Sequence, residues 1–248
     1  MKRLCVLDPN VPSQNARGLC ALAIMTKAPQ AGQVKTRLVP PLKPDEAAEL
    51  NKCFLRDIAA AISNAATGKD AYGIAVYTPI GAELIYTDIL PANFSLLPQR
   101  GDQFGERLYF AALDLFQCGF KSVCLIDSDS PTVPAKNFVQ AVKQLQPPGD
   151  CIVLGPCDDG GYYLIGLKKS HAELFERVDW STERVLAQTM RNAAKIGLDV
   201  KLLPIEYDID DGTALRRLSN ELLGQNARDS VAPNTRKFLA RITARNKL

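Results

Sequence analysis

Short apolar runs alternate with longer amphipathic stretches along most of this chain, and the alternation predicts its secondary structure. Continuous apolar runs are typical of strands buried in a parallel sheet. They occur at 19–26, 72–78, 94–99, 121–127, 150–156, 161–167 and 199–205. Apolar positions that recur about every 3.6 residues predict helices instead. Such stretches lie at 44–66, 102–119, 134–145 and 181–197, and two more helical stretches follow residue 211.

Strands that alternate with helices of this length predict βαβ units around a largely parallel sheet in three layers. No internal repeat or linker divides the 248 residues, so we expect one domain over 1–248. Residues 1–18 show little periodicity and predict an irregular lead-in, and 225–248 predict a C-terminal helical tail. The helix over 181–197 is expected to be capped by Ser181 and stopped by Gly197.

Composition narrows the function classes. The chain is 46% hydrophobic with a net charge of +3, and its basic residues are spread out, which argues against a nucleic-acid partner. Its seven cysteines form no CxxC pair, which predicts reduced thiols in a cytoplasmic protein without a zinc site. The apolar run at 19–25 is too short to span a membrane. A monomer and a homodimer are both compatible with the sequence.

Polar segments follow the predicted strands where a ligand site is expected. In sheets of this type, ligands bind beyond the carboxyl ends of the strands. The segments are basic at 27–38 and acidic at 127–131, 157–161 and 207–211. One basic loop and three acidic clusters at one edge suit a phosphate held by Lys and Arg, with a divalent cation held by carboxylates.

The basic loop, KAPQAGQVKTRL at 27–38, matches neither of two common phosphate-binding loops. Val34 stands where a Walker A loop needs glycine before Lys-Thr, and Gly32 is the only glycine of a would-be GxGxxG. A tight turn at Gly32 with free amides and nearby cations still suits an anion. A solvated turn with scattered lysines explains this loop equally well when it is taken alone.

The acidic clusters offer carboxylates for a cation or for ligand hydroxyls. Asp127 and Asp129 of DSDSP alternate in an extended chain, so both can face one cation, although such segments are also common turns. In CDDGG, Asp158 and Asp159 can accept hydrogen bonds from ligand hydroxyls. The YDIDD segment can complete a metal shell, or its Asp211 can simply cap the next helix. The single histidine, His171, argues against histidine-based metal sites and triads.

These segments together resemble a known family. The motifs KAPQAGQVKTRL (27–38), QRGDQFGERL (99–108), DSDSP (127–131), DDGGYYLIG (158–166), VDWST (178–182) and YDIDD (207–211) occur in this order. The chain resembles bacterial glycosyltransferase-A-like (GT-A) proteins of the selenodomain-associated transferase 1 type. These are relatives of molybdenum-cofactor guanylyltransferase and 2-phospholactate guanylyltransferase. The resemblance implies a three-layer, Rossmann-like nucleotide-diphospho-sugar transferase fold that binds a nucleotide and Mg²⁺ or Mn²⁺.

The resemblance also implies roles for individual residues. Those expected to bind the nucleotide and its phosphates are Lys27, Gly32, Lys35, Thr36, Arg37, Gln99, Asp102 and Arg107. Those expected on the acceptor or sugar side are Asp159, Gly160, Gly161 and Tyr162. Asp129 and Asp210 match the metal positions, and Lys35, Asp129 and Asp159 are the candidate catalytic residues. The family usually has a small residue where this chain has Asp127, so Asp129 is the preferred ligand.

Three functions are compatible with these residues. The leading hypothesis is a metal-dependent glycosyltransferase that uses a nucleotide sugar and a small-molecule acceptor. The second is a nucleotidyltransferase, guanylyl- or cytidylyl-transferring, that acts on a small phosphorylated acceptor. The same loop and aspartates serve both reactions, so the fold alone does not choose between them. The third is a nucleotide-binding module without catalysis, against which the retained carboxylates argue.

Overall fold

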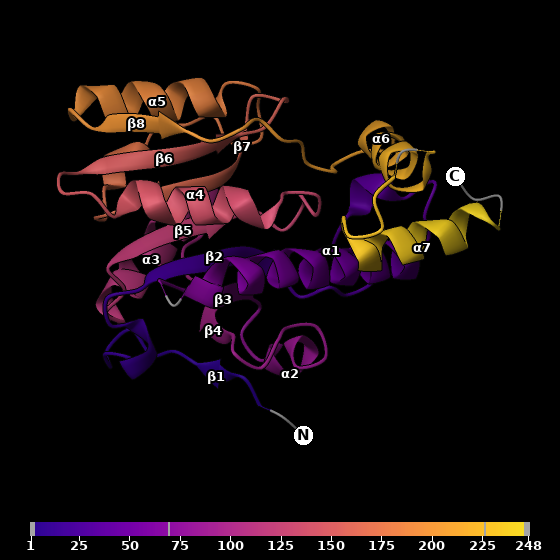
Figure 1. Ribbon diagram of the computed structural model, residues 1–248, viewed down its shortest axis with the longest axis horizontal. Helices are drawn as coiled ribbons and strands as arrows, with labels where there is room; N and C mark the ends of the chain where they lie inside the picture. The colour runs from indigo at the N-terminus through magenta and orange to yellow at the C-terminus, as the bar shows by residue number, and fades with distance from the viewer. Residues whose placement is uncertain (1–2, 69, 226, 246–248) are drawn as a thin grey trace.

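The strands form one sheet of order β1–β4–β3–β2–β5–β7–β6–β8 in the computed structural model, which describes residues 3–68, 70–225 and 227–245 (Figure 1). Within these residues the strands are β1 (Cys5–Val6), β2 (Cys20–Lys27), β3 (Ala71–Thr78), β4 (Ser95–Pro98), β5 (Ser122–Ile126), β6 (Cys151–Pro156), β7 (Tyr162–Leu167) and β8 (Asp199–Leu202). β2 and β5 lie at the centre because their runs are buried on both faces. The predicted order of strands and helices is confirmed.

One strand, β7, runs against the others. It pairs antiparallel with β5 on one side and with β6 on the other, and Ile126 of β5 lies opposite Leu164. Because β7 is reversed, its first residue lies at the edge where β5 and β6 end. The connection 157–161 is therefore at the carboxyl edge of the parallel strands, together with the segments that follow β2 and β5.

The helices cover both faces of the sheet. They are α1 (Pro44–Ala65), α2 (Glu83–Tyr86), α3 (Phe104–Gln117), α4 (Ala135–Leu145), α5 (Val185–Lys195), α6 (Gly212–Leu223) and α7 (Pro233–Thr243). α1 and α4 pack on the face nearer the viewer in Figure 1, and α3 and α5 pack on the other. None of the helices in the described parts of the chain is long and apolar enough to cross a membrane.

Helix α4 shows how the pattern produces the packing. Its apolar residues Phe138, Ala141, Val142 and Leu145 recur at i, i+3, i+4 and i+7, which puts them on one face. All four are buried against the sheet. Truncation of a buried phenylalanine such as Phe138 typically costs about 3–5 kcal/mol.

A third apolar cluster lies beyond the sheet. The N-terminal half of α1 packs with α6, α7 and the segment before α6, through residues such as Leu50, Phe54, Ile209 and Phe238. In Figure 1, α6 and α7 accordingly stand at the end of the molecule beyond the tip of the β8 arrow. Because Ile209 is part of this cluster, the packing of the cluster fixes the position of the 207–211 segment.

Some local predictions are wrong. The lead-in is not wholly irregular, because Cys5 and Val6 pair with β4 and extend the sheet by one strand. Ser181 does not cap α5, since its φ of 63° is left-handed and the helix begins after Arg184. The region after β3 holds the short helix α2 rather than only a loop. Gly197 does follow the end of α5, with a left-handed φ of 70°.

Candidate active site at the carboxyl edge of the sheet

The basic loop and the three acidic segments meet at this edge, as the sequence predicts. They line two adjoining cavities, which share Arg37, Asp129, Ser181 and Asp210. The cavity on the side of the basic loop, of about 350 Å³, is called the basic pocket. The cavity between β5, β7, α3 and the 180–185 turn, of about 360 Å³, is called the acidic pocket.

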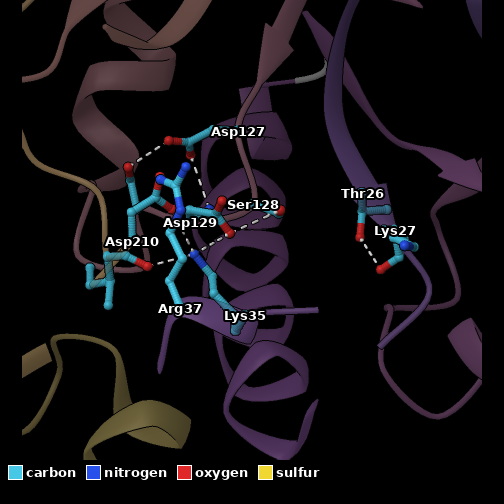
Figure 2. A network of polar contacts seen from close by, with 10 residues as sticks. Thr26, Lys27, Lys35, Arg37, Asp127, Ser128, Asp129 and Asp210 are labelled. Atoms are coloured by element: carbon cyan, nitrogen blue, oxygen red, sulfur yellow. Dashed lines mark hydrogen bonds and ion pairs between the residues drawn. The ribbon is translucent and has the colours of Figure 1, made fainter. Parts of the chain in front are cut away.

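Lys35 joins the two halves of the site. Its Nζ lies 2.9 Å from Asp129 Oδ1 and 3.3 Å from Asp210 Oδ1, and it donates a hydrogen bond to the Ile209 carbonyl (Figure 2). The side chain is only 5% exposed. Burial alone would lower the pKa of Lys35, but the charges of Asp129 and Asp210 raise it above its ordinary value. The lysine therefore stays charged, although it is buried.

The other residues of the basic loop are more open. Lys27 is exposed, donates a hydrogen bond to Gln33 at 3.3 Å, and stands apart from the Lys35 cluster in Figure 2. Lys27 and Thr36 both line the basic pocket. The Arg37 side chain is 72% exposed, with Nη1 3.7 Å from Asp210 Oδ2. Gly32 takes a left-handed φ of 73° at the turn but lines neither pocket.

Carboxylates crowd the acidic pocket. Burial, followed by repulsion from Asp129, raises the pKa of Asp127 well above its usual range, even though Ser130 donates a hydrogen bond to it at 2.7 Å. Burial and the charges of Asp159, Asp210 and Asp129 raise the pKa of Asp208 to about 6. Negative charge gathered in this way is stabilised by a cation.

The glycine-rich turn between β6 and β7 builds one wall of the acidic pocket. Asp159 and Gly161 line it, and Asp159 Oδ1 accepts a hydrogen bond from the Gly161 amide at 2.8 Å. Gly160 has a φ of 91°, and a Cβ there would lie 2.2 Å from the carbonyl oxygen of Glu183. Only glycine therefore allows the turn to pack against the segment that leads into α5. Tyr162, the first residue of β7, lines the pocket with Gly161.

The structure does not bring Gln99, Asp102 and Arg107 into either pocket. The Gln99 side-chain amide donates instead to the backbone carbonyls of Thr26 and Val76. The Arg107 guanidinium donates to the carbonyls of Gly101 and Asp102 and so holds the turn before α3. The Gln99 and Arg107 side chains therefore stabilise loops. Their assignment to the nucleotide stays a prediction.

Two aromatic residues that the sequence did not single out line the acidic pocket. Phe104 and Trp180 meet edge to face, with ring centroids 5.2 Å apart. Gly105 makes this approach possible, since a Cβ at that position would lie 2.6 Å from the Trp180 indole nitrogen. The sequence could have indicated these two residues, because both lie in the motifs at 99–108 and 178–182 and because the chain has one tryptophan.

Two carboxylates at this edge are suitable ligands for a divalent cation. In residues 3–68, 70–225 and 227–245, no three His, Cys, Asp or Glu side chains are arranged to hold a metal ion on their own. Asp129 and Asp210 nevertheless offer carboxylate oxygens to the region that both pockets share. Mg²⁺ is usually held by one or two carboxylates together with substrate phosphates and water. The residues thus fit a cation that binds together with a phosphate ligand.

Comparisons with known proteins bear on the fold and on the class of protein. Residues 61–182 match the model of a family described as "Uncharacterized protein conserved in bacteria (DUF2064)". No curated protein matches the sequence. A crystal structure from Desulfovibrio desulfuricans G20, provisionally named a nucleotide-diphospho-sugar transferase, is 27% identical, with a TM-score of 0.79. The similarity covers 91% of this chain and 95% of that one. It supports a transferase that uses a nucleotide.

More distant structures share the fold. CMP:2-keto-3-deoxy-manno-octonic acid synthetase in complex with CTP is 8% identical, with a TM-score of 0.52, over 81% of this chain and 96% of that one. A cytidylyltransferase from Leptospira borgpetersenii is 12% identical, with a TM-score of 0.51, over 92% and 94%. The predicted Rossmann-like fold of nucleotidyl and glycosyl transferases, with helices on both faces of a mainly parallel sheet, is therefore confirmed.

Proposed function

We propose that this protein is a metal-dependent transferase that takes a glycosyl group from a nucleotide sugar. The observation that carries the proposal is the contact of Lys35 with Asp129 and Asp210 at the junction of the two pockets. A cationic loop for a diphosphate and a carboxylate pair for a cation lie side by side there. The 27% identical structure named as a nucleotide-diphospho-sugar transferase supports the choice of donor.

The basic pocket is the proposed site of the donor's phosphates. Lys27, Thr36 and Arg37 line it and are exposed, so their donors are free to turn toward phosphate oxygens. Lys35 is held rigidly by its two carboxylates, so its charge is already positioned when the donor binds. Asp129 and Asp210 would hold the divalent cation. That cation would neutralise negative charge that develops on the departing diphosphate.

The acidic pocket is the proposed site of the acceptor. An acceptor hydroxyl oxygen forms the new bond to the anomeric carbon, while the bond from that carbon to the diphosphate oxygen breaks. The nucleoside diphosphate leaves with the electron pair of the broken bond. Asp159 lines this pocket and is the proposed acceptor of the hydroxyl proton.

A thermal-shift panel tests the choice of donor. The melting temperature is measured with nucleoside triphosphates, nucleoside diphosphates and nucleotide sugars, each with and without Mg²⁺ or Mn²⁺. We expect metal-dependent stabilisation by at least one nucleotide sugar and by its diphosphate. Stabilisation by a triphosphate alone would favour nucleotidyl transfer instead. Stabilisation by none of them would overturn the proposal.

A further inference from the structure

The acidic pocket is unbalanced in charge. Six carboxylic residues line it, against one basic residue, Arg37; they are Asp127, Asp129, Asp159, Glu183, Asp208 and Asp210. Lys35 forms ion pairs with Asp129 and Asp210, and Arg37 forms one with Asp210. Asp159 and Glu183 form no ion pair with any residue in the described part of the chain. Their charges therefore face the cavity without a basic partner.

Ionised carboxylates only accept hydrogen bonds. A ligand group that contacts Asp159 and Glu183 must therefore bring donors, such as hydroxyl or ammonium groups. A phosphate or carboxylate group brings acceptors and negative charge, and like charges close together are destabilising by several kcal/mol.

Part of the pocket lining is apolar. Phe104 is 50% exposed and contacts Trp180 edge to face, and both rings line the cavity. The buried side chains of Leu108, Leu125 and Ile165 also line the cavity. Aromatic side chains supply a large, flat apolar contact surface, which suits the apolar face of a ring compound.

From this arrangement we propose that the acidic pocket selects a hydroxylated ring compound without phosphate or carboxylate groups. Its hydroxyl donors meet Asp159 and Glu183, and its apolar face rests on Phe104 and Trp180. The inference rests on the proposed function, because it assigns the class of acceptor for the same transferase site. It distinguishes this chain from a transferase that acts on a phosphorylated acceptor. The carboxylates would repel a phosphorylated acceptor, and such repulsion contributes to specificity alongside the favourable contacts with a free sugar.

Trp180 provides a direct test, because it is the only tryptophan in the chain and it lines this pocket. Its fluorescence is titrated with matched pairs of sugars: glucose, mannose, glucosamine and N-acetylglucosamine, each against its 6-phosphate. We expect at least one free sugar to change the emission at a concentration at least tenfold lower than its 6-phosphate. A 6-phosphate that binds better than its free sugar, or no response to any free sugar up to 100 mM, overturns the inference.

A charge-reversal pair sharpens the test. Glu183→Arg places a positive charge at the pocket, so the preference for the free sugar should fall at least tenfold. Glu176→Arg makes the same change at an exposed position outside the pocket and should leave the preference as it is. An unchanged preference in Glu183→Arg, or equal changes in both variants, would show that the pocket charge does not select the ligand.

The fluorescence test of the acceptor class and the thermal-shift test of the proposed function can fail separately. The fluorescence titration needs no nucleotide, whereas the thermal-shift panel needs no acceptor. Metal-dependent nucleotide binding together with preferred binding of sugar phosphates would overturn the acceptor class alone. Absence of nucleotide binding would overturn the transferase, whatever the fluorescence shows.

Discussion

Lys35 Nζ lies 2.9 Å from Asp129 Oδ1 and so connects the loop after β2 to the loop after β5. The two residues are far apart in the sequence, and the lysine side chain is 5% exposed. A second contact, to Asp210 Oδ1 at 3.3 Å, adds the segment after β8. One ammonium group therefore holds together three of the four segments that form the site.

Lys35→Met should destabilise the protein, because it removes the ammonium group from Asp129 and leaves Asp210 with only the more distant Arg37 of its two basic partners. Breaking a fully buried pair costs about 3–5 kcal/mol, but here the aspartates are 31% and 52% exposed, so about 1–3 kcal/mol is expected. The free energy of unfolding in urea measures this. Lys27→Met is the matched control, since the exposed Lys27 ammonium forms one hydrogen bond, to Gln33, and no ion pair within the described residues. It should change stability by less than about 0.5 kcal/mol. Equal effects of the two substitutions would contradict the role given to Lys35.

Gly160→Ala should be far more damaging than Gly32→Ala. Both glycines have a positive φ, which costs an alanine about 1–2 kcal/mol. At Gly160 the added Cβ would also lie 2.2 Å from the Glu183 carbonyl oxygen, whereas at Gly32 nothing lies within 4 Å. We expect Gly160→Ala to cost about 3 kcal/mol or more. Urea unfolding of both variants checks the difference, and similar costs would show that the turn adapts without strain.

Asp208→Asn should stabilise the protein above pH 6 and have little effect near pH 4. The pKa of Asp208 is raised from its ordinary value of 3.8 to about 6, so the folded protein holds this proton more tightly than the unfolded chain. The stability that this group contributes is fully present below pH 3.8 and is lost as the pH rises through about 6. Asparagine has no proton to lose, so this loss of stability does not occur in the variant. After allowance for solvent screening, we expect its free energy of unfolding above pH 6 to be higher by on the order of 1 kcal/mol.

Melting temperatures of the two proteins from pH 4 to pH 8, in the presence of a chelator, measure this difference. The curves should lie close together near pH 4 and separate as the pH passes 6. A gain of equal size at every pH would mean that the carboxyl charge is not the cause.

The sequence predicts the sheet and the convergence of the site for a clear physical reason. Buried strands such as 121–127 are uninterrupted apolar runs, and their carboxyl ends share one edge, so the sequence predicts DSDSP and the basic loop at the same edge. The pairing of β2 with β5, which the structure shows, makes them neighbours. The contact of Lys35 with Asp129 could not be specified, because it depends on the left-handed backbone of Lys35.

Other features depend on tertiary contacts that no local pattern encodes. β1 is two residues long, and both are exposed, so it carries no strand periodicity. The Gln99 amide is engaged by the backbone of β2 and β3 rather than by the pocket, although its motif position suggested a ligand contact. The Phe104–Trp180 wall exists because Gly105 lets two distant motifs pack closely, which only the folded chain shows.

The measurement that tests the account most directly is a calorimetric titration of the wild type and Asp129→Asn with GDP, UDP, CDP and ADP, each with and without Mn²⁺. Asp158→Asn is the control, because Asp158 is an exposed neighbour of the site that lines neither pocket. We predict that at least one diphosphate binds the wild type and the control at least tenfold more tightly with Mn²⁺, a gain of about 1.4 kcal/mol or more. Asp129→Asn should lose that gain and keep its metal-free affinity within about twofold of the wild type. A gain of the same size in Asp129→Asn would contradict the central claim that this carboxylate holds the cation of a metal–nucleotide complex.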